Sequence, residues 1–340
     1  MPKPLGTPLT KRPTITDVAT TAGVSKGTVS RYLNGRQWVS TESGDAVRAA
    51  IEQLGYVPNS AARNLAKDRT NTVALIFCEP TRMLSQNAIF VELLVTVTRE
   101  LAEQGIAAFL MFADQDNLKP GVIAYLRGRH VDGAIMLSAS SDDDFVDALI
   151  ATGVPMVGAG PVTSARVTEV PFVGVDDAMG SRQAVDHLIA TGHRRIGVVT
   201  GELATPGALL RSQAAQTALT QAGLEPWAVE AEGYSVEAGM AATAAILRAH
   251  PHLDALYVAS DVLAIGALRV LRERGLRVPQ DVAVVGFDDI PPAATLDPPL
   301  TTIATIEDGR SPVRLLLAML EGKNVESVVL PTRLVSRASV

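Results

Sequence analysis

The stretch Ile15–Leu33, ITDVATTAGVSKGTVSRYL, constrains the fold more than any other part of the chain. Gly23 permits a tight turn in its middle, and Ser25 stands where a helix N-cap is favourable. The apolar residues on either side recur at helical spacing and would share a small core: Val18, Ala19, Ala22, Val24, Val29 and Leu33. This pattern predicts a helix-turn-helix, whose second helix can enter the major groove of DNA. The alternative is an ordinary helical hairpin with a solvated, charged face.

The residues that follow extend the same unit. Ser40 is placed to cap a third helix that ends at Gly55. After Pro58, which blocks continuation of that helix, only about two helical turns can form before the polar run that begins at Lys67. Such a short helix is marginal in water, so we expect this segment to order on binding, with Leu65 wedged into the DNA minor groove. The alternative is a linker whose Leu65 packs on the neighbouring domain.

Charge is distributed unevenly along the chain. Residues 1–70 contain ten Lys and Arg against five Asp and Glu, whereas the other 270 residues contain 20 against 31. The overall net charge of −6 therefore conceals a basic head on an acidic body. This asymmetry is typical of a DNA-binding module attached to a domain with another task.

Several classes of protein are disfavoured by what the sequence lacks. The single cysteine, Cys78, excludes an intramolecular disulfide, fits a reducing cytoplasm and is expected to be a small buried side chain. No apolar signal segment opens the chain, and no run of about eighteen apolar residues could cross a membrane. Zinc-type Cys/His spacing and phosphate loops are absent, so we expect no metal and no cofactor.

From Asn71 onward, continuous apolar runs alternate with amphipathic helical patterns. Runs such as VALIF, GAIML and VAVVGF predict parallel strands buried on both faces by helices. Sheets of this kind bind ligands at the carboxyl ends of their strands. An α/β enzyme is a competing interpretation, but no nucleophile elbow or dinucleotide motif is present, and none of the five histidines stands beside a nucleophile and an acid. An exported or cytoplasmic sugar-binding protein is the other competitor; the absence of a signal segment counts against export and the basic head favours DNA.

Taken together, these motifs resemble the lac repressor/galactose repressor family of bacterial transcription regulators. The resemblance rests on ITDVATTAGVSKGTVSRYLNG, the pair Val39-Ser40, AIEQLGYVPNSAARNLA and several later motifs, and runs from about Ile15 to the C-terminus. It implies an all-α helix-turn-helix head followed by an α/β core like that of periplasmic binding proteins, built from two doubly wound parallel-sheet subdomains. An effector would bind in the cleft between them.

On this basis the chain is expected to divide into four parts. These are a disordered basic tail (1–13), a helix-turn-helix domain (14–57), a hinge helix and linker (58–70), and an effector-binding and dimerisation core (71–340). The first subdomain of the core would comprise about 71–175 and 300–327. The second would comprise about 176–299 and 328–340, with the chain crossing near Asp176 and again around Pro298–Ile303.

The resemblance also implies roles for residues of the head. Base reading falls to Lys26, Gly27 and Arg31, with Arg31 suited to a guanine pair of acceptors. Contacts to the DNA backbone are expected from Thr14, Ser25, Thr28, Ser30, Asn34 and Arg36. The minor-groove hinge is expected to use Asn59, Ala62 and Leu65.

In the core, the residues expected to bind the effector are Phe90, Asp176, Arg211, Tyr234, Ser260 and Asp288. Asp288 follows the apolar run VAVVGF, where a carboxylate can accept hydroxyl hydrogen bonds, and Arg211 offers a planar fork of donors. Phe90 and Tyr234 would supply flat faces for the effector, or either could instead pack in the core. Asp176 either faces the cleft or caps a helix, and Ser260 replaces the family's more usual Asn. Asp261 is expected to cap the next helix, and Gly160 stands where relatives often carry a charge.

The function that the resemblance implies is a homodimeric regulator in the bacterial cytoplasm, associated with the nucleoid and without a membrane partner. It would repress carbohydrate-utilisation genes from a pseudo-palindromic double-stranded operator and be released by a mono- or disaccharide. The open alternatives are an activator, a corepressor-dependent regulator, an effector that is a purine or another small non-sugar metabolite, and, more remotely, a sugar-binding protein without a DNA role. No heptad extension follows the last strand, so we expect a dimer and no coiled-coil tetramer.

Overall fold

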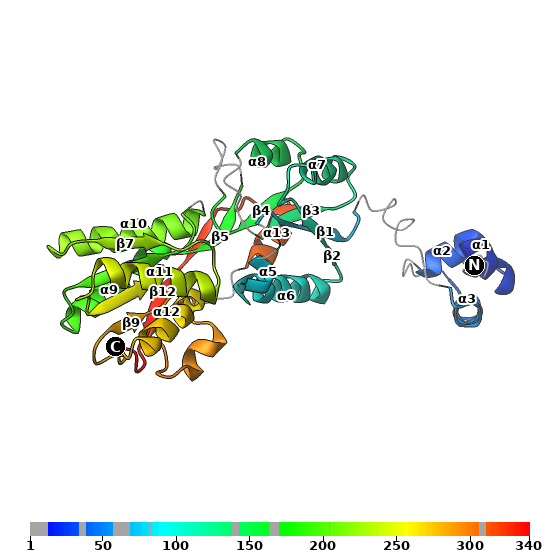
Figure 1. Ribbon diagram of the computed structural model, residues 1–340. Helices are drawn as coiled ribbons and strands as arrows, with labels where there is room; N and C mark the ends of the chain where they lie inside the picture. Colours follow the sequence, from blue (N-terminus) through cyan, green and yellow to red (C-terminus); the bar gives the residue numbers. More distant parts are fainter. Residues whose placement is uncertain are drawn as a thin grey trace, which may run out of the picture. The chain divides into compact units, whose positions relative to one another are not determined.

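The computed structural model describes residues 13–33, 39–56, 69–79, 81, 83–86, 88–137, 143–162, 170–203, 205–305 and 311–340. The chain divides into two compact units, Met1–Thr70 and Asn71–Val340 (Figure 1). The predicted basic tail and hinge helix fall almost entirely outside the described residues. Within those residues, no helix combines the length and apolar character needed to cross a membrane.

The described part of the first unit contains three helices: α1 (Ile15–Thr21), α2 (Lys26–Leu33) and α3 (Thr41–Leu54). Ser40 caps α3 by accepting a hydrogen bond from the N–H of Ser43, and α3 ends at Gly55, whose φ of 57° is left-handed. Gly23, with φ of 65°, makes the turn between α1 and α2. The three helices bury one shared core: Val18, Ala19, Val29, Val47, Ala50 and Tyr56.

The first subdomain of the second unit is built on a six-stranded parallel sheet. In sheet order the strands are β11 (Val328–Leu330), β5 (Phe172–Val175), β4 (Met156–Ala159), β3 (Gly133–Met136), β1 (Thr72–Phe77) and β2 (Ala107–Phe112). The helices are α5 (Met83–Gln86), α6 (Ala88–Glu103), α7 (Lys119–Arg127), α8 (Asp143–Ile150) and α13 (Pro312–Leu320). Helices α7 and α8 pack on one face of the sheet, and α5, α6 and α13 on the other (Figure 1).

The second subdomain has a four-stranded parallel sheet of the same kind. Its strands are β7 (Trp227–Glu230), β6 (Ile196–Thr200), β8 (Ala255–Val258) and β9 (Ala283–Val285). Helices α9 (Asp177–Ala190) and α10 (Pro206–Gln221) cover one face, and α11 (Val236–Ala249) and α12 (Asp261–Glu273) the other. An antiparallel pair, β10 (Thr302–Thr305) and β12 (Thr332–Val335), and a short 3₁₀ helix η2 (Pro291–Thr295) complete it.

The expected division of the C-terminal segment was wrong in two places. β10 belongs with the second subdomain, because Thr301 bridges to Val285 of β9 and the N–H of Asp288 donates to the carbonyl of Ile303. β11 belongs with the first subdomain, because it pairs in parallel with β5. The chain therefore crosses between subdomains three times: before α9, between β10 and α13, and between β11 and β12. A short apolar run can join either sheet, so its partner is decided by long-range hydrogen bonding that sequence patterning does not report.

Strand β7 and helix α13 are among the elements not anticipated from the sequence. Strand β7 lies at a sheet edge and its residues alternate between half-buried and exposed, so it lacks the continuous apolar run of the central strands. Helix α13 is preceded by Ser311, which caps it by accepting a hydrogen bond from the N–H of Arg314, and Pro312 stands at its first position. Cys78 is buried as expected, 9% exposed.

Candidate functional site

Helix α2 presents the three residues expected to read bases, Lys26, Gly27 and Arg31, and all three are exposed. In the unbound head, Nε of Arg31 donates to the carbonyl of Gly27 at 3.1 Å. A Cβ added at Gly27 would lie 3.6 Å from Oγ of Ser25 and 3.8 Å from a terminal nitrogen of Arg31, both ordinary contacts. Packing within the head therefore does not require a glycine at position 27. Because Gly27 has no side chain, it leaves a bare patch on the outer surface of α2.

Among the hydroxyls expected to touch the DNA backbone, those of Thr14, Ser25 and Thr28 lie at or near helix N-termini, whereas Ser30 lies in the middle of α2. Thr14 and Asp17 form a capping box at α1, and Oγ of Ser25 accepts from the N–H of Thr28 at 3.1 Å to cap α2. Thr28 and Ser30 are half-buried. The remaining expected contacts lie outside the described residues: Asn34, Arg36, Asn59, Ala62 and Leu65.

A cavity of about 680 Å³ lies between the two subdomains of the core. Phe90 lines it from the first subdomain, and Arg211, Tyr234 and Asp288 line it from the second, so four of the six residues expected to bind an effector do border the cavity. Its size and its mixture of apolar and polar walls are those of a small-molecule site.

Arg211, on α10, is the centre of the polar wall. Its Nε donates to Oδ1 of Asp177 at 2.6 Å, and one terminal nitrogen donates both to Oδ1 of Asp288 at 2.9 Å and to the carbonyl of Ala259 at 2.8 Å. The ring of Phe287 lies under the guanidinium, 3.6 Å from Cζ to the ring centroid. The guanidinium is therefore held in one plane by contacts on its edge and its face.

The three charged groups of this cluster are shielded from water. The side chain of Arg211 is 15% exposed and those of Asp177 and Asp288 are each 6% exposed. Burial opposes the charged form of Arg211, but the two carboxylates outweigh burial and raise its pKa, so the guanidinium stays charged. Burial also raises the pKa of Asp288 above its ordinary value, and Arg211 counteracts part of that rise.

The loop that carries Asp288 is held in an uncommon backbone conformation. Asp288 has φ of 110° and Asp289 has φ of 54°, a region that non-glycine residues seldom adopt. Such conformations persist where the surroundings over-determine them, and they cluster at functional sites. Asp289 is itself occupied by an ion pair with Arg337 at 2.6 Å.

Ser260 was expected to touch the effector, but the structure gives it a supporting position. It is fully buried, at 0% exposed, and its Oγ donates to Oδ2 of Asp288 at 3.2 Å. It is absent from the described lining of the cavity. Ser260 therefore orients the carboxylate of Asp288. Its side chain is short, so from the end of β8 the hydroxyl reaches the neighbouring Asp288 loop but not the cavity.

Asp261 does not cap α12 as expected. Ser260 holds the N-cap position, whereas the buried carboxylate of Asp261 accepts from Oγ1 of Thr302 at 2.6 Å and from the N–H of Ile290 at 3.0 Å. These bonds tie α12 to β10 and to the end of the Asp288 loop. Burial, with a smaller contribution from Asp288, raises the pKa of Asp261 to about 8.

The aromatic residues stand on opposite walls. Phe90 packs edge-on against Phe77, with ring centroids 5.3 Å apart. Tyr234 packs against the apolar clusters of both subdomains, and its hydroxyl lies 3.4 Å from that of Thr205. Gly160 also borders the cavity, with φ of 121°, so a charged side chain there would be strained.

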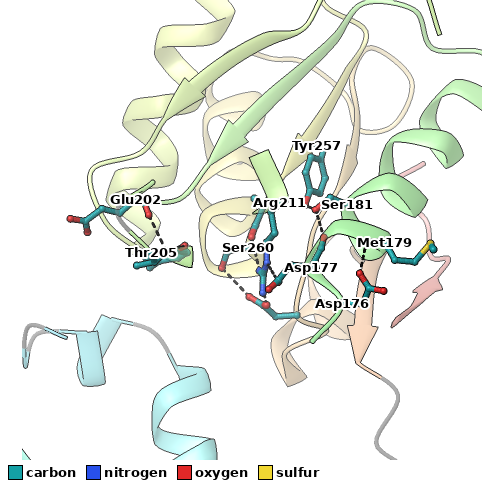
Figure 2. Close-up of polar contacts among 12 residues, drawn as sticks. Asp176, Asp177, Met179, Ser181, Glu202, Thr205, Arg211, Tyr257 and Ser260 are labelled. Carbon is teal, nitrogen blue, oxygen red and sulfur yellow. Dashed lines mark hydrogen bonds and ion pairs between the residues drawn. The ribbon is translucent and has the colours of Figure 1, made fainter. Parts of the chain in front are cut away.

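Asp176 was expected to bind the effector, and the structure places it elsewhere. Its side chain caps α9 by accepting from the N–H of Met179 at 2.9 Å, and it points away from Arg211 (Figure 2). The next residue, Asp177, points to Arg211 instead and borders the cavity. The doubled aspartate after a buried strand was visible in the sequence, but the direction of each side chain depends on where α9 begins.

Comparison with known proteins agrees with both units. Residues 14–59 match the family described as bacterial regulatory proteins, lacI family, and residues 185–340 match the periplasmic binding protein-like domain. Over 335 residues the chain is 39% identical to the HTH-type transcriptional regulator CelR of Thermobifida fusca, covering 97% of this chain and 98% of the relative.

Two solved structures extend the likeness. One is the complex of the transcriptional regulator CelR with cellobiose, with 37% sequence identity, a TM-score of 0.73, and coverage of 97% of this chain and 100% of the other. The other is the lac repressor dimer bound to operator and the anti-inducer ONPF, with 30% identity, a TM-score of 0.85, and coverage of 97% and 99%. The chain therefore belongs to the lacI family of bacterial regulatory proteins.

Proposed function

We propose that this protein is a transcriptional repressor that binds a pseudo-palindromic operator and is released from it by a small sugar. The observation that carries the proposal is the Asp177–Arg211–Asp288 cluster on a cavity wall, in the same chain as a helix-turn-helix head. The likeness to CelR, solved with cellobiose, and to the lac repressor, solved on operator, supports both halves. Both relatives are regulators, and we infer no catalytic role.

The proposed sugar site combines directional and flat contacts. Carboxylate oxygens of Asp177 and Asp288 accept from sugar hydroxyls, and Arg211 donates to ring or hydroxyl oxygens. Tyr234 and Phe90 receive the apolar C–H faces of the sugar. Because the cavity is bordered by both subdomains, a sugar there favours one arrangement of the subdomains over another. As an inducer, it binds the DNA-free arrangement more tightly, by a few kcal/mol as is typical of coupling between sites.

We further propose that the repressor acts as a homodimer at the bacterial nucleoid. The first subdomain exposes apolar side chains on α6 and on the edge strand β2, which a second copy would cover: Ile89, Val91, Val95, Phe109 and Leu110. Sedimentation across a concentration series should show a dimer, and a stable tetramer would contradict this.

The test of function begins with selection of binding sites from random duplexes by the purified protein. The proposal expects a two-fold symmetric sequence with half-sites about one helical turn apart. Titration with cellobiose and a panel of other mono- and disaccharides should then weaken binding to that sequence. Asp288→Ala should abolish the response while operator affinity stays intact, whereas Asp281→Ala, on the surface of the same subdomain, should leave both unchanged. A sugar that strengthens operator binding would contradict induction, and an unchanged response in Asp288→Ala would contradict the site.

A further inference from the structure

We propose that the cleft selects uncharged sugars and rejects their phosphorylated or acidic derivatives, and that Asp177 is the residue that sets this preference. The inference rests on the proposed sugar site and specifies which chemical class of sugar that site accepts. It follows from three features of the cavity: the charge of the polar cluster, the charge of the remaining walls, and the place that Asp177 occupies at the start of α10.

The polar cluster carries more negative than positive charge. Two carboxylates, Asp177 and Asp288, share the single guanidinium of Arg211. Nε and one terminal nitrogen of that guanidinium are already committed to protein acceptors. A hydroxyl group can donate to a carboxylate and accept from the remaining terminal nitrogen of Arg211. A carboxylate has no proton to donate at neutral pH, and a phosphate monoester carries a charge of about −1.5 to −2 there. Either group would lie beside two like charges in a poorly hydrated site.

The rest of the cavity wall also carries more negative than positive charge. Among the described residues that line the cavity, six are acidic and three are basic. The acidic ones are Glu79, Glu92, Glu100, Asp177, Asp288 and Asp289, and the basic ones are Arg211, Arg314 and Arg333. Asp289 is balanced by its ion pair with Arg337, which leaves five acidic residues against three basic ones. An anion that enters the cleft therefore approaches a wall with an excess of negative charge.

One element of the cleft would attract an anion if it were free. Helix α10 is 16 residues long, and Thr205, Pro206 and Gly207 at its N-terminus border the cavity. The partial positive charge of a helix N-terminus favours phosphate and carboxylate groups. Here the carboxylate of Asp177 already stands against that first turn: a Cβ built on Gly207 would lie only 3.3 Å from Oδ2 of Asp177.

Asp177 thus occupies the position that a ligand's anionic group would otherwise take. It reaches this position because α9 starts directly after the chain crossing, so its first side chain points across to α10 (Figure 2). Removing its charge while keeping its shape leaves Arg211 balanced by Asp288 alone. It also leaves the positive end of α10 without the negative charge of Asp177 beside it. The variant Asp177→Asn is therefore expected to admit anions that the parent protein rejects.

The experiment measures binding by isothermal titration calorimetry with cellobiose, with the same disaccharide phosphorylated at a terminal 6-hydroxyl, and with inorganic phosphate. The parent protein should bind the phosphorylated sugar at least about 100-fold more weakly than cellobiose, and inorganic phosphate not at all. In Asp177→Asn, the ratio of the affinity for cellobiose to that for the phosphorylated sugar should fall by about tenfold or more. This variant should also gain binding of inorganic phosphate. Asp177→Glu, which keeps the charge, should retain the rejection.

Asp186→Asn is the matched control, because it removes the same charge from the exposed face of the same helix, where Asp186 pairs with Arg182. It should leave every affinity unchanged. The inference would be overturned if the parent protein bound the phosphorylated sugar as tightly as cellobiose, or if inorganic phosphate bound in the parent cleft. It would also be overturned if folded Asp177→Asn showed the same ratio of the two sugar affinities as the parent.

These outcomes are separable from failure of the proposed function. If no sugar in the panel binds or alters operator binding, the proposed function fails. The phosphate titrations of the parent and Asp177→Asn still decide whether Asp177 excludes anions.

Discussion

The Nε–H of Arg211 donates to Oδ1 of Asp177 over 2.6 Å. This bond links α10, on the wall of the cleft, to the start of α9, where the chain first crosses between subdomains. Asp177 is the first residue of α9, which directly follows the crossing, and Arg211 lies in the second turn of α10. The same guanidinium holds Asp288, 77 residues further along the chain. One arginine thus links three segments that are remote in sequence.

We expect Arg211→Ala to lower the free energy of unfolding of the core by about 3–5 kcal/mol, because it leaves two buried carboxylates without a counter-charge. Urea unfolding followed by circular dichroism measures this change. Arg277→Ala is the control: Arg277 also pairs with an aspartate, Asp281, but its side chain is 71% exposed and water replaces the partner. The free energy of unfolding of Arg277→Ala should equal that of the parent. If both variants lost the same free energy of unfolding, burial would not be the reason why Arg211 stabilises the core.

Asp261→Asn should remove a pH dependence of stability. Burial raises the pKa of Asp261 in the folded protein to about 8, whereas in the unfolded chain it is ~4. Between these values the folded state holds a proton that the unfolded state has released. Stability of the parent should therefore fall as the pH rises from about 4 to about 8, by up to about 1.4 kcal/mol per pH unit, and this contribution should be flat outside that window.

The asparagine variant mimics the protonated acid, since its amide can donate to Thr302 and its carbonyl can accept from Ile290. The difference in unfolding free energy between variant and parent should therefore grow with pH across the window. Chemical denaturation at a series of pH values checks this. Parallel pH profiles for the two proteins would show that Asp261 is ionised at neutral pH.

Arg31→Ala should cost about 1–3 kcal/mol of operator affinity and relax the preference at one base pair in each half-site. The reason is that a bidentate arginine–guanine contact carries sequence information, whereas a phosphate contact does not. Fluorescence anisotropy with the selected operator and with random duplex separates the two. Arg48→Ala, which removes the same charge from the exposed side of α3, should weaken both complexes alike, if at all. Equal losses on both duplexes for Arg31→Ala would make Arg31 a phosphate contact.

Leu65→Ala should reduce operator affinity and DNA bending together. A leucine wedge between base steps stabilises a kink, and pyrimidine–purine steps such as CpG are the easiest to deform. End-to-end energy transfer on labelled operator measures the bend, and an operator with a stiffer central step is the control, on which the parent protein should resemble the variant. Full bending by the variant would show that Leu65 is not the wedge.

The described part of the head could be predicted almost completely from its sequence. Its turn at Gly23, its caps at Ser25 and Ser40 and its helical end at Gly55 each depend on residues within about one helical turn, and the structure has them as expected. The alternation of apolar strands and helices in the core could also be predicted, because strands buried on both faces of a parallel sheet are continuous apolar runs. Asp288 could be singled out because it follows such a strand at the edge where ligands bind, and Arg211 because the family resemblance implies an arginine there.

Only the tertiary structure decided which of two adjacent carboxylates, Asp176 or Asp177, borders the cleft. It also decided that Ser260 supports Asp288 from a buried position, and that β10 and β11 exchange subdomains relative to the expectation. The reason is physical. Caps and periodicity arise from interactions between neighbours along the chain, whereas the direction of a helix's first side chain and the partner of a short strand are decided by contacts with segments tens to more than a hundred residues away.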